Sequence, residues 1–203
     1  QRINDPADRK KIVAEIIDSA RRSKRPDFGY AVVAYHAANT AVNGKSIAQI
    51  NVLRGRTPTM ENEVDTILEM MLAGGAQMVF HGMSEDDVRL ILQYPFSMIG
   101  ADGGVQTGRG VPHPRSYGTN ARVLGKYVRE ERLISLEDAV RRMTSLAAQK
   151  FQLKDRGLLR EGFAADIVIF DEKTVADRAT FEDPHQFSAG FQAVIVNGQV
   201  VVE

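Results

Sequence analysis

An acid, an imidazole and a guanidinium group lie close together near the middle of this chain, at Asp102, His113 and Arg115. Asp102 follows the apolar run 96–100, which is typical of a buried strand, and two glycines after it would let a ligand approach the backbone closely. The chemistry of α/β barrels lies at the carboxyl ends of their strands. Asp102 is therefore a candidate functional residue, although an Asp-Gly pair after a strand is also common turn chemistry.

Pro114 stiffens the loop between His113 and Arg115, so the guanidinium fork could be presented to a carboxylate with little entropy to lose. The alternative is a surface arginine that pairs with any nearby acid. His81 ends the preceding apolar run and is followed by Met83, so both could point toward the same site. A histidine at a strand end is more often a hydrogen-bonded structural residue, and a methionine more often fills a core.

Metal-ligand patterns are missing from the sequence. The 203 residues contain no His-x-His pair, no cysteine and no other cluster of metal-ligand residues. His36, at the end of an apolar run, and His185, in a loop with a proline, are expected to be structural or exposed. No Gly-Lys-Ser/Thr follows the glycines of 103–110, which excludes a phosphate-binding loop.

Helix caps, apolar periodicity and turn residues predict the elements that position these side chains. Helices are expected over about 6–22, after the capping box Ser46-x-x-Gln49, from Thr57-Pro58 to Gly74-Gly75, after Ser84, and near 120–130 and 135–150. Strands are expected at 30–35, 76–80, 96–100, 165–171 and 193–202, the last with an Asn197-Gly198 hairpin turn. The order strand, helix, strand over 76–100 favours a parallel sheet.

Composition narrows the class of protein. With 43% hydrophobic and 26% charged residues the chain can bury a core, and 26 basic against 26 acidic residues leave no net charge to attract nucleic acid or an anionic membrane. No apolar run approaches the roughly 20 residues that span a bilayer. The absence of cysteine makes the cytoplasm the default compartment. The start at Gln1, without an initiating methionine, is interpreted as a cut within a longer chain.

Three motifs carry a family resemblance. They are Met83-Ser84-Glu85-Asp86-Asp87-Val88, Met98-Ile99-Gly100-Ala101-Asp102-Gly103, and His113-Pro114-Arg115 with the following Gly118, Arg122 and Tyr127. Together they closely resemble the D-aminoacylase (N-acyl-D-amino-acid deacylase) family of the amidohydrolase superfamily. The tail, with Gly157-Leu158-Leu159 and Phe181-Glu182-Asp183-Pro184, is similar to the strands with which these enzymes complete a small β-sandwich.

The resemblance implies an α/β fold: the C-terminal portion of a metal-dependent (β/α)8 amidohydrolase barrel over residues 1–156, with an inserted segment at about 25–80, and β-sandwich strands over 157–203. It implies hydrolysis of the amide of an N-acyl-D-amino acid, a small-molecule substrate, with one or two zinc ions as cofactor. Asp102 would bind zinc, take a proton from the attacking water and return it to the leaving amine. Arg115 would hold the substrate's α-carboxylate and Met83 would line the pocket for its side chain, with His81 and His113 near the site.

The chain departs from the family pattern in two places. Ala101 stands where the family usually has serine, and the remaining zinc ligands would lie upstream of Gln1, in a missing N-terminal half without which the barrel cannot close. The fragment is therefore expected to be inactive alone. Two alternatives stay open: another amidohydrolase, such as a cyclic amidase of the hydantoinase or dihydroorotase type, and a catalytically dead remnant that folds around a partner.

Overall fold

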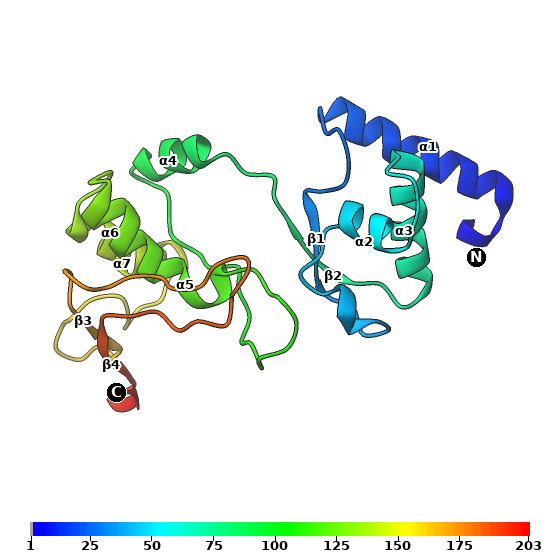
Figure 1. The fold of residues 1–203 in the computed structure, drawn as a ribbon. Helices are drawn as coiled ribbons and strands as arrows, with labels where there is room; N and C mark the ends of the chain where they lie inside the picture. Colours follow the sequence, from blue (N-terminus) through cyan, green and yellow to red (C-terminus); the bar gives the residue numbers. More distant parts are fainter. Residues whose placement is uncertain (1) are drawn as a thin grey trace. The chain divides into compact units, whose positions relative to one another are not determined.

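A computed structural model describes residues 2–203 of the chain. The chain forms two compact units, which are considered separately. The first contains the residues up to Gly82 together with Thr107–Pro112, and the second contains Met83–Gln106 together with His113–Glu203. Figure 1 shows helices and short strands in both units, so the predicted mixed α/β class is confirmed.

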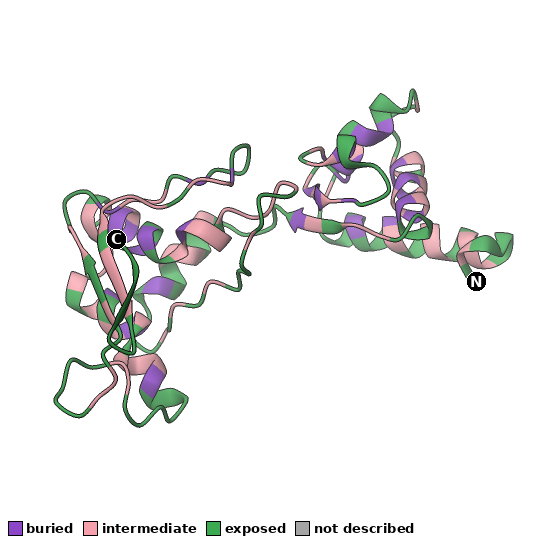
Figure 2. Ribbon diagram, turned by 90° about the horizontal axis from the view of Figure 1, so that it is seen from below, coloured by how far each residue is buried: buried purple, intermediate pink, exposed green. Residues whose placement is uncertain are grey.

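The first unit combines helices with a two-stranded sheet. The helices are η1 (Arg2–Asn4), α1 (Pro6–Arg22), η2 (Thr40–Val42), α2 (Ile47–Leu53) and α3 (Met60–Leu72), and the strands are β1 (Ala31–Tyr35) and β2 (Gln77–Phe80). Local sequence signals explain the helix starts, since the Asp5 side chain accepts bonds from two first-turn N–H groups of α1 and Ser46 forms the predicted capping box with Gln49. The buried core residues lie mainly on α1, α2, α3 and β1, and buried positions are purple in Figure 2.

Two predictions for the first unit are corrected. The helix expected to open at Thr57-Pro58 begins at Met60, because the Thr59 side chain accepts the N–H of Asn62 and caps the helix there. The strands β1 and β2 pair antiparallel. The parallel pair expected between 76–80 and 96–100 is also wrong, because β2 pairs with β1 and residues 96–100 form no strand.

The second unit combines helices with a three-stranded antiparallel sheet. Its helices are α4 (Glu85–Gln93), α5 (Arg115–Arg122), the π-helix η3 (Val123–Glu130), α6 (Leu136–Met143) and α7 (Ser145–Lys150). Its strands β3 (Ile167–Phe170), β4 (Phe191–Val196) and β5 (Gln199–Val202) lie in the order β3-β4-β5. The predicted Asn197-Gly198 turn joins β4 to β5, with both residues at positive φ (50° and 79°).

The expected strand 96–100 is wrong in this structure. Residues 95–107 contain neither helix nor strand, and Phe96 is 70% exposed. A strand needs a neighbour that takes its backbone hydrogen bonds. Within residues 2–203 no strand pairs with this segment, and the N–H of Ile99 instead points to the carbonyl of Arg142 in α6, 3.4 Å away.

The predicted helix over 135–150 is interrupted. Thr144, with φ −128° and ψ −90°, separates α6 from α7, and its hydroxyl donates to the carbonyl of Val140 at 2.7 Å. The residues on both sides of the expected domain boundary at 156/157 belong to the second unit. That boundary, the closed barrel and the β-sandwich stay predictions.

Candidate functional site

Asp102 and Arg115 are in direct contact. Nη2 of Arg115 donates to Oδ2 of Asp102 at 2.8 Å, and Nε donates to the backbone carbonyl oxygen of the same residue at 3.0 Å. Asp102 has φ +46°, a left-handed conformation that aspartate tolerates better than most residues. Its side chain is 89% exposed and that of Arg115 is 44% exposed. The contact therefore places a carboxylate and a guanidinium group side by side at the surface of the second unit.

His113 holds the start of the helix that carries Arg115. The cap residue of α5, Pro114, makes no side-chain cap bond. Instead Nδ1 of His113 accepts the backbone N–H of Arg115 at 3.0 Å, and the His113 ring lies edge-on to the ring of Phe181, with centroids 4.9 Å apart. His113 thus helps to fix the first turn of α5.

The glycine after Asp102 permits close packing on α5. A Cβ atom on Gly103 would lie 2.9 Å from Cα of Ser116, which is too close for a side chain. Gln106 adds hydrogen bonds to the carbonyl of Gly104 at 3.1 Å and to Oγ of Ser116 at 3.2 Å. The segment after Asp102 is therefore attached to the same helical turn as Arg115.

The other two predicted site residues, Met83 and His81, belong to different units. Met83 belongs to the second unit, directly before α4, and is 80% exposed. His81 belongs to the first unit, where its backbone N–H donates to the carbonyl of Tyr30 at 2.8 Å. Their places at the site stay predictions. His36 is buried and its Nδ1 lies 2.8 Å from the carbonyl oxygen of Gly75, as a structural histidine should.

Sequence reasoning missed Tyr117 and underestimated His185. The phenol oxygen of Tyr117 lies 2.8 Å from Nδ1 of His185, and Oγ of Ser188 donates to the carbonyl of Tyr117 at 2.9 Å. The two bonded side chains are 68 positions apart in the chain. No local pattern links them, so only the nearness of Tyr117 to Arg115 could have drawn attention to it.

An ionic network connects the start of α4 to η3. Oε1 of Glu85 accepts bonds from Nζ of Lys126 and, at 2.8 Å, from the hydroxyl of Tyr127. The bond from Lys126 keeps the pKa of Glu85 below its usual range, and burial raises the pKa of Tyr127. Arg89 donates twice to Glu131, at 2.9 and 3.1 Å, which lowers the pKa of Glu131. These contacts fix α4, whose first residue, Glu85, lies two positions after Met83.

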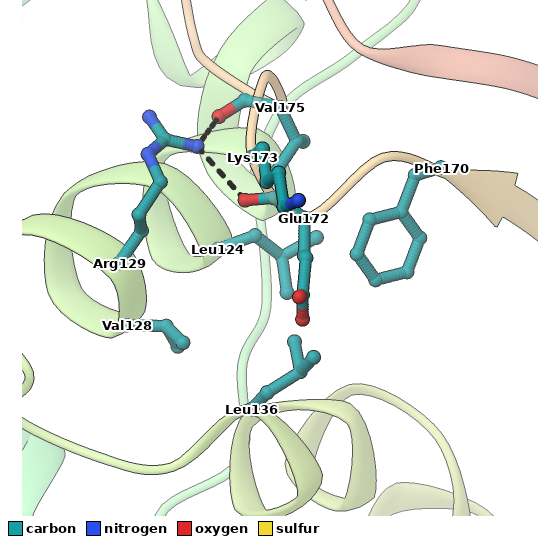
Figure 3. Close-up of a pocket in the computed structure, with 8 residues that line it drawn as sticks. All are labelled: Leu124, Val128, Arg129, Leu136, Phe170, Glu172, Lys173 and Val175. Carbon is teal, nitrogen blue, oxygen red and sulfur yellow. Dashed lines mark hydrogen bonds between the residues drawn. The ribbon is translucent and has the colours of Figure 1, made fainter.

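A shallow pocket of about 160 Å³ in the second unit lies apart from the Asp102–Arg115 contact (Figure 3). Nη1 of Arg129 donates to the carbonyls of Val175 at 2.5 Å and Glu172 at 3.3 Å on its rim. None of the predicted site residues lines it, and ligand pockets are usually about 300 Å³ or larger. We therefore do not assign the function to this pocket. Its lining residues are Leu124, Val128, Arg129, Leu136, Phe170, Glu172, Lys173 and Val175.

The described residues supply only part of the side chains that a metal site needs. Asp102 offers an exposed carboxylate, which is a suitable zinc ligand, but zinc in proteins is usually bound by three or four protein side chains. Among residues 2–203 no group of three or more His, Cys, Asp or Glu side chains could hold a metal ion. The described part of the chain therefore fits one ligand of a metal site and not a complete one. In the same residues, no helix is long and apolar enough to cross a membrane.

Comparison with known proteins identifies the family. The model of the amidohydrolase family matches residues 8–202, which is nearly the whole chain. The chain belongs to the amidohydrolase family.

Within that family the chain is similar to deacylases of N-acyl-D-amino acids, so the predicted resemblance is confirmed. It is 39% identical over 173 residues to the D-aminoacylase of Alcaligenes xylosoxydans xylosoxydans, and 46% identical over 123 residues to the N-acyl-D-aspartate deacylase of the same organism. These matches cover 85% and 61% of the chain, but 34% and 24% of the relatives. The chain thus spans about a third or less of the curated relatives it matches.

Solved structures agree with this likeness. The N-acyl-D-glutamate deacylase of Bordetella bronchiseptica, complexed with zinc and a phosphonate inhibitor, matches with a TM-score of 0.76 and 34% identity over 95% of the chain and 43% of that structure. A D-aminoacylase structure matches with a TM-score of 0.75 and 34% identity over 96% of the chain and 43% of that structure.

Proposed function

We propose that the chain is part of a metal-dependent enzyme that hydrolyses the amide bond of N-acyl-D-amino acids, giving a carboxylate and a free D-amino acid. The observation that carries the proposal is the Asp102–Arg115 contact, which places a proton acceptor beside a carboxylate-binding group in a chain similar to deacylases. Residues 1–156 would contribute to a (β/α)8 barrel and 157–203 to a small β-sandwich. The similarity to two deacylase structures supports this arrangement.

Asp102 is proposed as a zinc ligand and as the general base. Bound zinc would lower the pKa of a water molecule and polarise the acyl carbonyl group. The Asp102 carboxylate would accept a proton from the attacking water and then donate it to the nitrogen of the leaving amine. Its exposure suits this role, because both the water and the scissile nitrogen must reach the carboxylate oxygens.

Arg115 is proposed to bind the α-carboxylate of the substrate. A guanidinium group has five N–H donors, and the bonds to Asp102 use two of them. The edge formed by Nη1 and Nη2 can still bind a carboxylate through two parallel bonds. Arg115 would thereby hold the substrate with its amide carbon near the proton acceptor.

The other zinc ligands are proposed to come from parts of a longer protein outside these residues. The support is that the chain covers 34% of the D-aminoacylase relative, and that residues 2–203 offer one ligand at the site. The 203 residues alone would then be inactive, and Met83 would line the substrate pocket only in the longer protein.

The proposal is tested in the complete, zinc-loaded protein with an N-acetyl-D-amino acid as substrate. Asp102→Ala should lower kcat by orders of magnitude while thermal unfolding is unchanged. The control is Asp18→Ala, which removes another exposed aspartate paired with an arginine, Arg21, at 3.8 Å. Near-normal turnover in Asp102→Ala would refute the assignment, and hydrolysis of cyclic amides alone would favour a cyclic amidase.

A further inference from the structure

The segment 177–190 holds the first two turns of α5 at several points. It runs alongside α5 in the second unit, where it is drawn in orange (Figure 1). Asp177 accepts a bond from Arg122 at 3.1 Å, and a Cβ atom on Gly118 would lie 2.7 Å from Cβ of Asp177. Only a glycine at this position allows the segment to approach the helix so closely.

Tyr117 is fixed at both its side chain and its backbone. Its phenol oxygen bonds to Nδ1 of His185 at 2.8 Å, and its carbonyl accepts the hydroxyl of Ser188 at 2.9 Å. Its ring meets the rings of His185 and Phe187 edge-on, each with centroids 5.7 Å apart. Tyr117 lies two residues after Arg115 in the same helical turn, so these contacts restrict how that turn can rotate.

The same segment also contacts His113, which bonds to the first residue of α5. Phe181 packs edge-on against His113, whose Nδ1 accepts the N–H of Arg115. The segment 177–190 therefore holds the turn that carries Arg115 at two points, Tyr117 and His113. Neither contact involves the guanidinium group itself.

We propose that Tyr117 and His185 are positioning residues for carboxylate recognition by Arg115. The inference rests on the proposed deacylase function. Alignment of two parallel N–H···O bonds depends on the direction of the guanidinium plane, and that direction is set by the helical turn from which the side chain extends. A turn that could rotate would still carry the positive charge, but it would lose part of the preference for a planar carboxylate.

The test separates positioning from general stability. The substrates are the N-acetyl-D-amino acid that the complete, zinc-loaded protein hydrolyses fastest and the primary carboxamide of the same compound, which lacks the carboxylate charge. The quantity compared is the ratio of kcat/KM for the acid to that for the carboxamide. A purely structural defect lowers both values together and leaves this ratio unchanged.

Four variants are compared with the wild type. Tyr117→Phe removes the phenol oxygen and His185→Phe removes the partner nitrogen but keeps a ring. His185→Asn keeps a hydrogen-bonding group near the place of Nδ1. Tyr127→Phe is the matched control, because it removes another phenol bonded at 2.8 Å, to Glu85, in the same unit.

Tyr117→Phe and His185→Phe should each lower the acid-to-carboxamide ratio by about three- to tenfold, the effect of losing one hydrogen bond. The loss should appear mainly as a higher KM for the acid. His185→Asn and Tyr127→Phe should keep the wild-type ratio. If His185→Phe fails to fold, the pair Tyr117→Phe and His185→Asn decides the question.

An active wild type whose Tyr117→Phe variant keeps the wild-type ratio overturns the inference and leaves the proposed function standing. A lowered ratio in Tyr127→Phe of the same size also overturns it, because any lost phenol bond would then have the same effect. A wild type that hydrolyses neither compound overturns the proposed function and the inference with it.

Discussion

Replacing Arg142 by methionine should destabilise the second unit, because this arginine is buried and hydrogen-bonded to both α4 and Asp138. Its side chain is 2% exposed on α6. Nη1 donates to the carbonyl oxygens of Leu92 at 2.5 Å and Tyr94 at 2.9 Å, and Nε donates to Oδ2 of Asp138 at 2.7 Å. Leu92 and Tyr94 end α4, so Arg142 holds the point where the chain turns toward Asp102.

The size of the effect follows from the groups left behind. Methionine fills most of the volume of the arginine stem, so the cavity contribution is small. The carbonyl of Leu92 loses its donor, whereas that of Tyr94 still accepts the N–H of Ser97 at 3.0 Å. An unsatisfied buried acceptor costs about 1–3 kcal/mol. Asp138 keeps Arg141, which donates to its Oδ1 at 3.0 and 2.8 Å, so we count no further cost for this carboxylate. The expected loss in the free energy of unfolding is therefore about 1–3 kcal/mol.

The assay is urea denaturation at pH 7, with Arg141→Met as the control. Arg141 also bonds to Asp138, and it donates to the carbonyl of Pro95 at 2.7 Å, but its side chain is 40% exposed. Solvent can replace its bonds, so its removal should cost less than about 1 kcal/mol. Equal losses in the two variants, or a loss below about 1 kcal/mol in Arg142→Met, would refute the reasoning from burial.

The same pair predicts a change with pH. The bond from Arg142 keeps the pKa of Asp138 below its ordinary value, and the bond from Arg141 acts in the same direction. The unfolded chain therefore binds this proton at a higher pH than the folded chain does. The stability from the pair is complete above the ordinary aspartate pKa of about 4 and is lost as the pH falls through the lowered value. In Arg142→Met the stability should fall less steeply below about pH 4 than in the wild type.

Four further outcomes follow from the structure and the proposed function. Arg115→Lys should raise KM by about tenfold or more, because a point charge replaces a two-bonded fork; an unchanged KM would count against carboxylate binding. Gly118→Ala should lower the free energy of unfolding by about 1–3 kcal/mol, because the new Cβ would lie 2.7 Å from Cβ of Asp177. This cost outweighs the higher helix propensity of alanine. Gly104→Ala, with open space around the new Cβ, should leave the stability unchanged. The denatured mass of the native gene product should exceed twice 22.4 kDa. Dialysis of the complete protein against a chelator should abolish its turnover of the N-acetyl-D-amino acid, and added zinc should restore this turnover.

Local signals predicted the elements whose ends are stabilised within a few residues. Asp5 caps α1, Ser46 and Gln49 close their capping box, and Asn197-Gly198 makes the β4–β5 turn, all as expected. In each case the bonds or dihedral angles that decide the structure belong to neighbouring residues. Such features need no knowledge of the rest of the fold.

Predictions that depended on distant partners were less successful. An apolar run such as 96–100 has strand character, but it becomes a strand only when another strand lies beside it. The bond between Tyr117 and His185 joins positions 68 residues apart, and nothing in the spacing of either residue indicates it. The interruption at Thr144 likewise depends on a hydroxyl that bonds back to the carbonyl of Val140.

The sequence and the structure give different reasons for the position of Asp102. The sequence argument placed Asp102 at the end of a strand, and that strand is not present. Instead Arg115 binds both the carbonyl and the carboxylate of Asp102, and so it holds the residue in a left-handed conformation, with φ +46°, that would otherwise be costly. His113 and Tyr117 hold the turn that carries Arg115, so the direction of the Asp102 carboxylate, our proposed proton acceptor, depends on α5 and the segment 177–190. A carboxylate held in this way can stay exposed to water and substrate while its backbone is fixed.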